Sequence, residues 1–267
     1  MDLSKLEKLN AISEHYFLPN LASGKKLYRH SFKQAIFNLD MKITYYGQSC
    51  FLIETKGKTI LLDPFISGNP LAKSVDIDSI QADYIALSHG HQDHTLDAIS
   101  IAKRTGAKII AAFEVHTWAQ QQGIKNTHPM NPGGKWTFDF GTLMCVAAVH
   151  SSSFADGSYA GNPMGFVIWN EEACIYFAGD TALTMDMKLI PMLCPALDAA
   201  ILPIGDNFTM DVKGAVLASD FVDCPKVIGC HYDTFGFIEI DHNNAKRAFE
   251  DAGKALILLD IKEQMTI

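Results

Sequence analysis

The chain has 267 residues, of which 48% are hydrophobic and 19% are charged, and its 22 Lys and Arg against 30 Asp and Glu give a formal net charge of −8. This composition supports a large buried core and excludes general disorder, while the length allows one large domain or two small ones. No apolar run approaches the roughly 18 residues that span a bilayer, and charges at positions 2, 5, 7 and 8 argue against a secretory signal. We therefore expect a compact cytoplasmic protein without a membrane partner, and the acidic balance argues against a broad nucleic-acid surface.

The first 40 residues differ in character from the rest of the chain. Leucine and isoleucine recur at helical spacing at positions 3, 6, 9 and 12, Pro19-Asn20 ends this pattern, and a basic stretch follows at 25–33. We expect residues 1–40 to form a helical extension that packs on the main domain or on a neighbouring subunit, in which case the protein is a homo-oligomer. The alternative is an arm for a partner or a nucleic acid. Met41 begins a new pattern, so we place the main domain at 41–267.

The main domain shows strand patterns first and then strands alternating with helices. Apolar runs predict strands at 42–46, 51–55, 58–62, 84–87, 109–113, 143–149, 166–169, 174–178, 199–203, 227–230 and 255–259. Helical patterns lie at 95–104, 115–122, 183–193, 212–222 and 242–252, the last with Asp241 as its N-cap and Gly253 as its stop. This order predicts an α/β fold with two mixed sheets packed face to face and helices outside, a four-layer αββα sandwich.

The segment at 88–94 (Ser-His-Gly-His-Gln-Asp-His) directly follows the strand expected at 84–87. On an extended strand exit, His89 and His91 project to the same side because side chains repeat every two residues. If a helix then begins at Thr95, Asp93 and His94 face a second centre nearby. Three imidazoles and a carboxylate within six positions suit a divalent metal such as zinc. The alternative is a polar loop with incidental histidines.

This H-x-H-x-D-H pattern resembles the metallo-β-lactamase superfamily, and four further elements of that family follow its order within residues 41–267. Asp63 stands at a strand end before the pattern, and His150 follows a later strand. Asp180 follows Phe-Ala-Gly, and His231 ends a late strand. The resemblance implies the four-layer αββα sandwich of that superfamily.

The resemblance also implies a dinuclear site with seven ligands. Carried over by position, one ion is held by His89, His91 and His150, and the other by Asp93, His94 and His231, with Asp180 bridging the two. Asp63 would orient a ligand histidine from behind. The implied cofactors are two divalent metal ions, zinc in first place, with manganese and iron(II) also compatible.

The flanking sequence is similar to a compact group of metal-dependent hydrolases that resemble L-ascorbate-6-phosphate lactonase. The motifs that carry this similarity include His150-Ser-Ser-Ser, Gly161-Asn-Pro, the segment 203–210 (Pro-Ile-Gly-Asp-Asn-Phe-Thr-Met) and the segment 231–235 (His-Tyr-Asp-Thr-Phe). One departure is Gln48, where that group usually has histidine. Gln48 is outside the implied ligand set, so we expect metal binding to be unaffected by it.

The implied chemistry is hydrolysis of a small-molecule ester, lactone or phosphodiester. Two cations about 3.5–4 Å apart share a water and lower its pKa toward ~7, which gives a bridging hydroxide that attacks the carbonyl or phosphoryl centre. Asp93 and Asp180 are the expected catalytic carboxylates. Candidate substrate contacts are His128, Asn207, Thr209 and Tyr232, with ordinary structural hydrogen bonding as their alternative role.

Several other functions are weighed against this one. A redox diiron relative would carry Glu at position 91, which is histidine here, and a β-lactamase of the commonest class would use cysteine at the second metal and lack Asp180. An RNA-processing phosphodiesterase or other nuclease would carry a long basic arm inside the domain, whereas the basic stretch here is short and terminal. The remaining alternative is a non-catalytic metal-binding scaffold or sensor.

Overall fold

A computed structural model of the chain describes residues 40–267, so the extension expected at 1–40 lies outside the described residues except for Asp40. The described part contains two seven-stranded sheets. The first has the order β14-β1-β2-β3-β4-β5-β6, and the second has the order β13-β12-β11-β10-β9-β8-β7. The strands of the first sheet are β1 (Lys42–Gly47), β2 (Cys50–Thr55), β3 (Lys58–Leu62), β4 (Tyr84–Ala86), β5 (Lys108–Ala112), β6 (Thr127–Met130) and β14 (Gln264–Thr266). Those of the second are β7 (Lys135–Phe138), β8 (Gly141–Ala147), β9 (Met164–Trp169), β10 (Cys174–Phe177), β11 (Ala199–Pro203), β12 (Lys226–Cys230) and β13 (Ala255–Ile257).

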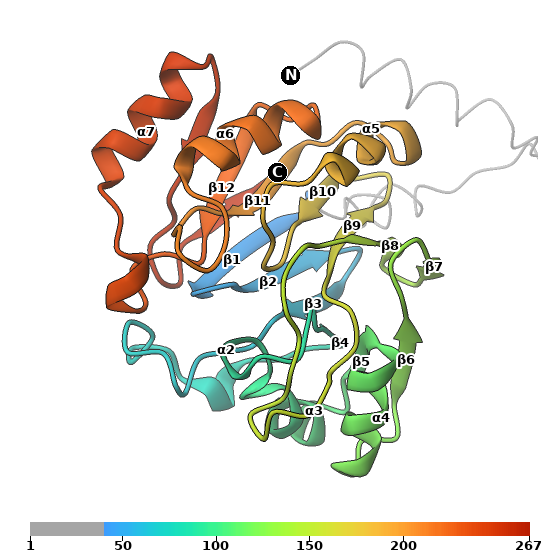
Figure 1. Cartoon of the computed structure of the whole chain (residues 1–267). Helices are drawn as coiled ribbons and strands as arrows, with labels where there is room; N and C mark the ends of the chain where they lie inside the picture. The colour runs from blue at the N-terminus through green and yellow to red at the C-terminus, as the bar shows by residue number, and fades with distance from the viewer. Residues whose placement is uncertain (1–39) are drawn as a thin grey trace, which may run out of the picture. The chain divides into compact units, whose positions relative to one another are not determined.

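Helices cover the outer faces of both sheets (Figure 1). The α-helices are α2 (Gln92–Thr95), α3 (Ala98–Thr105), α4 (Phe113–Gln121), α5 (Ile190–Leu193), α6 (Val212–Phe221) and α7 (His242–Asp251), and the 3-10 helices are η1 (Ile77–Ser79), η2 (Met185–Leu189) and η3 (Gly236–Ile238). Helix α4 packs on β5 and β6 of the first sheet, whereas α6 and α7 pack on β11 and β13 of the second. At the start of α7, Asp241 accepts a hydrogen bond from the backbone of Asn244, as expected of the predicted N-cap.

Side chains of the second sheet alternate between two apolar layers. In β10, Ile175 and Phe177 belong to the core between the sheets, while Cys174 and Tyr176 belong to the core beneath the helices of the second sheet. A strand that is buried on both faces in this way needs a covering layer on each side. The fold class predicted from the sequence, an α/β four-layer sandwich, is confirmed.

One expected helix is interrupted. The pattern at 95–104 predicted a single helix, but the structure has α2 and α3 with a break at Asp97. The backbone N–H of Asp97 donates to Pro64 O at 3.1 Å, and its carboxylate accepts the backbone N–H groups of Ile66 and Ser67. Asp97 therefore ties the loop after β3 to the helices, and this contact replaces the regular helical hydrogen bond.

The strand ends that matter for function meet at one edge of the sandwich. Strands β3 and β4 are parallel neighbours. In the second sheet, β10, β11 and β12 are parallel, and β8 runs in the same direction because both β8 and β10 are antiparallel to β9. The loops that leave these carboxyl ends carry the residues that the sequence singled out.

Candidate metal centre

The loop after β4 places two histidines next to each other. His89 is fully buried, and its Nε2 lies 2.9 Å from Nδ1 of His91. His91 is the N-cap of α2, so the helix begins at Gln92 rather than at Thr95 as the sequence predicted. The earlier start puts Asp93 in the first turn of the helix, where a carboxylate is stabilised by the helix dipole.

The loop after β8 completes a first group of three histidines. His89, His91 and His150 each offer a ring nitrogen, and these atoms all lie within 4.8 Å of one another. The loop of His150 is fixed to the loop after β10, because Val149 N donates to Thr181 Oγ1 at 2.9 Å. Burial lowers the pKa of all three imidazoles, that of His89 furthest. Neutral imidazole is the form that binds metal.

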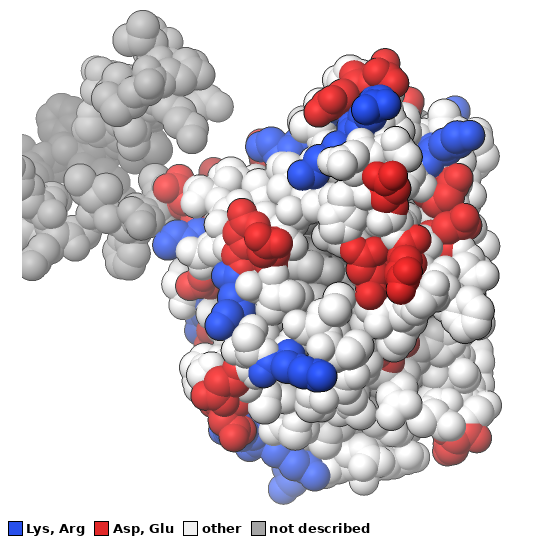
Figure 2. All heavy atoms as spheres, turned by 90° about the vertical axis from the view of Figure 1, so that its left-hand side faces the viewer, with Lys and Arg blue, Asp and Glu red and all other residues white. Residues whose placement is uncertain are grey.

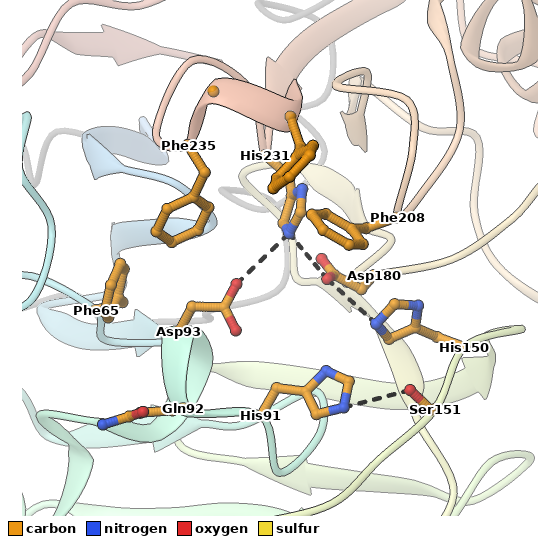
Figure 3. A pocket seen from close by; sticks show the side chains of 12 residues that line it. Phe65, His91, Gln92, Asp93, His150, Ser151, Asp180, Phe208, His231 and Phe235 are labelled. Atoms are coloured by element: carbon orange, nitrogen blue, oxygen red, sulfur yellow. Dashed lines mark hydrogen bonds and ion pairs between the residues drawn. The ribbon is translucent and has the colours of Figure 1, made fainter. Parts of the chain in front are cut away.

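A second group contains two histidines and two carboxylates, namely Asp93, His94, Asp180 and His231, whose ligand atoms also lie within 4.8 Å of one another. The Oδ2 atom of Asp180 is 3.0 Å from His231 Nε2 and 3.3 Å from His94 Nε2. The same oxygen is 3.5 Å from Nε2 of His150 in the first group. Figure 3 shows Asp180 between His231 and His150. The structure thus brings together all seven residues that the sequence singled out, with Asp180 at the junction of the two groups.

The chemistry of these residues fits a pair of divalent cations. Asp180 Oδ1 is buried and has no hydrogen-bond partner among the described residues. A buried polar atom without a partner is costly, so such atoms imply a missing ligand. Five imidazoles and two carboxylates make a nitrogen- and oxygen-rich donor set of the kind that zinc and other first-row divalent metals bind.

Asp63 holds one of these histidines from behind. This carboxylate is fully buried at the end of β3, accepts both the backbone N–H and the hydroxyl of Ser88, and lies 2.7 Å from His94 Nδ1. A carboxylate only accepts hydrogen bonds, so His94 Nδ1 carries a proton. His94 therefore directs Nε2 toward the other members of the second group.

Gln48 makes a contact that the sequence did not predict. It lies in the turn between β1 and β2 with a left-handed φ of 54° and is fully buried. Its side-chain Nε2 donates to Asp93 Oδ2 at 2.9 Å, and its backbone carbonyl accepts the backbone N–H of His231 at 2.9 Å. Gln48 thus contacts two members of the second group, one through its side-chain amide and one through its backbone, and these contacts argue against the expectation that metal binding is unaffected by it.

We predict that Gln48→Ala weakens metal binding at the second group by roughly 10- to 100-fold, the usual effect of removing a group that orients a ligand. Gln48→His, which restores a ring N–H donor, should recover part of this loss. Titration of the metal-free protein by calorimetry measures both effects. Gln264→Ala is the matched control, since the amide of Gln264 donates to Glu54 and Thr44 away from the second group. Wild-type affinity in Gln48→Ala would contradict a role for this amide.

The second group is internally paired when no metal is bound. Burial lowers the pKa of His231, but the carboxylates of Asp180 and Asp93 raise it to a net value of about 9. Burial likewise lowers the pKa of His94, and Asp180, Asp93 and Asp63 raise it well above its usual range. Burial raises the pKa values of Asp93 and Asp180, yet the two histidines hold both below the usual range. The metal-free group is therefore two imidazolium ions beside ionised carboxylates.

This charge state predicts that metal binding to the second group releases protons. At pH 7, His94 and His231 are protonated in the metal-free protein, and an imidazolium has no lone pair for a metal. We expect release of on the order of one to two protons per chain, with affinity rising about tenfold per pH unit for each proton displaced. The rise should level off above the His231 pKa of about 9. Calorimetry in buffers of different ionisation enthalpy counts the protons, and pH-independent affinity between pH 6 and 8 would contradict the pairing.

A cavity of about 740 Å³ opens beside the two groups. Besides five of the seven residues, its lining includes the rings of Phe65, Phe208, Phe235 and Phe237. The four candidate substrate contacts from the sequence (His128, Asn207, Thr209 and Tyr232) do not line it. His128, for example, lies on β6 and packs against Trp136 with ring centroids 5.1 Å apart. The one signal in the sequence for the residues that do line the cavity was that Phe208 and Phe235 fall within the motifs at 203–210 and 231–235.

Within residues 40–267, no helix is both long and apolar enough to cross a membrane.

Comparison with known proteins gives a matching family model and several similar proteins. A family model described as a beta-lactamase superfamily domain matches residues 42–231. A protein of Christiangramia forsetii, named a UPF0173 metal-dependent hydrolase, is 57% identical over 228 residues, which are 85% of this chain and 100% of that protein. A protein of the same name from Methylacidiphilum infernorum is 48% identical over 227 residues, again 85% and 100% of the two chains. Among solved structures, Igni18, a metallo hydrolase from Ignicoccus hospitalis, superposes with a TM-score of 0.77 at 34% identity and covers 85% of this chain and 98% of its own.

Proposed function

Because the chain belongs to the metallo-β-lactamase superfamily and is a metal-dependent hydrolase of that superfamily, we propose that it hydrolyses an ester, lactone or phosphodiester of a small molecule with two divalent metal ions. His89, His91 and His150 would hold one ion, and Asp93, His94 and His231 the other, with Asp180 shared. The observation that carries this proposal is the position of Asp180 Oδ2, which is within 3.5 Å of imidazole nitrogens from both groups. Zinc suits this donor set best, with manganese and iron(II) as alternatives.

When bound, the metal pair supplies a water of lowered pKa and a Lewis acid for the attacked oxygen. The chain's own residues complete the site around that water. The Asp93 side chain lines the cavity and is about one quarter exposed. Gln48 donates a hydrogen bond to its Oδ2, which fixes the carboxylate where it can accept a hydrogen bond from the attacking water. Asp63 keeps Nε2 of His94 free for the metal by accepting from Nδ1.

A nuclease function fits the described residues less well. On the face shown in Figure 2, Lys and Arg side chains are scattered among Asp and Glu and form no continuous basic stripe. Among residues 40–267, the lining of the cavity contains neither Lys nor Arg. Recognition of a nucleic-acid backbone depends on such cations. A small-molecule substrate therefore accords better with this surface.

The test uses the full chain, freed of metal with a chelator and reloaded with Zn²⁺, Mn²⁺ or Fe²⁺. We expect metal-dependent hydrolysis of a member of a panel of carboxylic esters, lactones and phosphodiesters, and its loss in folded Asp93→Ala. Asp186→Ala, which changes an exposed carboxylate in η2, is the control and should keep the wild-type rate. Protein with both sites loaded that turns over no member of the panel would favour the metal-binding scaffold instead.

A further inference from the structure

Four phenylalanine rings surround the open side of the metal-binding residues. Phe65 and Phe235 form one pair with ring centroids 6.2 Å apart, and Phe208 and Phe237 form another at 6.3 Å. In Figure 3, Phe65 and Phe235 lie on one side of Asp93 and His231, while Phe208 lies on the other side near Asp180. The rings come from three separate loops, after β3, after β11 and after β12. A group attached to a substrate carbonyl at the metals would thus meet aromatic surface on two sides.

Three of these rings are exposed although they are large and apolar, whereas Phe65 is buried. Phe208 is 49% exposed and Phe237 is 77% exposed. Their loops are nevertheless held by hydrogen bonds: in the loop that carries Phe208, the backbone N–H of Asp206 donates to Met210 O at 3.0 Å. In the loop after β12, Asp233 accepts the backbone N–H of Ile240 at 3.0 Å and closes the segment that carries Phe235 and Phe237. Exposed aromatic surface on fixed loops at the rim of a cavity is typical of a ligand site.

Outside the metal-binding groups, the described lining of the cavity offers no cation for a charged substituent, and its other polar side chains are those of Gln92 and Ser151. Among the described residues that line it, the ionisable side chains are the aspartates and histidines of those groups, and none is Lys or Arg. A phosphate group on the distal part of a substrate would lose hydration against phenylalanine rings without gaining a cation. This disfavours an ester or lactone that carries a phosphate group.

We propose that the substrate is an uncharged carboxylic ester or lactone that carries an aryl or bulky alkyl group, which packs between the two phenylalanine pairs; this rests on the proposed hydrolase function. Hydrolysis adds one water across the acyl C–O bond. The hydroxyl oxygen stays on the carbonyl carbon as a carboxylic acid, and the proton goes to the departing alcohol oxygen. The aromatic rim selects the substrate and takes no part in the bond changes.

Binding tests the cavity independently of turnover. Hydroxamates chelate metals, so the Zn²⁺-loaded chain is titrated with acetohydroxamate, with a hydroxamate carrying a phenylpropyl group, and with one carrying a phosphonate at the same distance. We expect the phenylpropyl compound to bind roughly tenfold to 100-fold more tightly than acetohydroxamate, because its ring leaves water for apolar surface. The phosphonate compound should bind no more tightly than acetohydroxamate. Tighter binding of the phosphonate than of the phenylpropyl compound would overturn the inference.

Variants locate the effect in the rim. The double variant Phe208→Ala with Phe237→Ala should reduce the phenylpropyl preference to less than about threefold while acetohydroxamate binds as before. Phe113→Ala is the matched control, because this ring is 55% exposed at the start of α4 and does not line the cavity. An unchanged preference in the double variant would overturn the inference.

A final comparison separates the two proposals. The Zn²⁺-loaded chain is given 4-phenylbutyrate and acetate esters of one alcohol. Faster hydrolysis of the phenylbutyrate ester supports both proposals, and equal rates overturn the substrate inference while hydrolysis itself stands. A phenylpropyl preference in binding without hydrolysis of any ester, lactone or phosphodiester overturns the hydrolase proposal and leaves the aromatic ligand site supported.

Discussion

Asp180→Asn should reduce metal-dependent hydrolysis by roughly a thousandfold or more and lower the number of bound metal ions below two per chain. The reason is geometric. One oxygen of Asp180 lies between the histidines of both groups, and among residues 40–267 only this carboxylate is paired with both. Asparagine keeps the shape but loses the charge that a pair of divalent cations requires. Metal content by atomic spectroscopy and initial rates on the same samples measure the two effects together.

Loss of folding has to be separated from loss of function in this variant. Without metal, the Asp180 charge is paired with His94 and His231, whose pKa values it raises. In Asp180→Asn these imidazoles can give up protons, so the metal-free variant avoids an unpaired buried cation and should remain folded. Asp186→Asn, on an exposed carboxylate, is the control for the substitution itself. Two bound metals and a rate within threefold of wild type in Asp180→Asn would refute the shared-carboxylate arrangement.

The sequence predicted the fold well because an apolar run is a local signal of a buried strand. All eleven strands expected in the main domain are present, and the layers follow from their burial. The three strands that were missed are short and lie at sheet edges. Strands β6 and β14 are the two edges of the first sheet, and β7 is an edge of the second sheet whose first three residues are exposed. Strands that bury little have no apolar run to reveal them.

The metal-binding residues likewise divide into those that have a local sequence signal and those that have none. The segment 88–94 was recognisable by itself because its four donors lie within six positions. His150, Asp180 and His231 have no local signal; each is a single residue after a strand, and only resemblance to a family assigned them. Their convergence depends on the shared direction of β8, β10 and β12, which no short segment encodes.

Gln48 and the phenylalanine rim were missed for a related reason. The contact from Gln48 to Asp93 joins residues 45 positions apart through a buried amide in a left-handed turn. Whether a phenylalanine is buried in a core or exposed in a cavity cannot be read from its type. The sequence thus identified donor atoms, whereas the structure was needed to see what holds them and what surrounds their substrate.

Asp63→Asn should weaken metal binding at the second group by roughly 10- to 100-fold although Asp63 need not touch a metal ion. In the native protein, Oδ2 of Asp63 accepts from His94 Nδ1, and Oδ1 accepts from Ser88 N. The asparagine side chain has only one acceptor oxygen, and this oxygen takes the place of Oδ1 and accepts the Ser88 N–H. Its NH₂ group then takes the place of Oδ2 and faces His94 Nδ1. His94 Nδ1 then loses its proton and becomes an acceptor, so the neutral ring keeps its one proton on Nε2, the atom that should bind the metal.

The matched control is Asp97→Asn, which alters a second buried carboxylate that accepts backbone N–H groups in the same region. Both variants should lose roughly 1–3 kcal/mol of unfolding free energy through weakened hydrogen bonds. Only Asp63→Asn should change the His94 tautomer, seen by ¹⁵N NMR of the imidazole, and the affinity for metal. Equal losses of metal affinity in the two variants would show that Asp63 acts through stability alone, whereas a tautomer change confined to Asp63→Asn would assign it the orientation of His94.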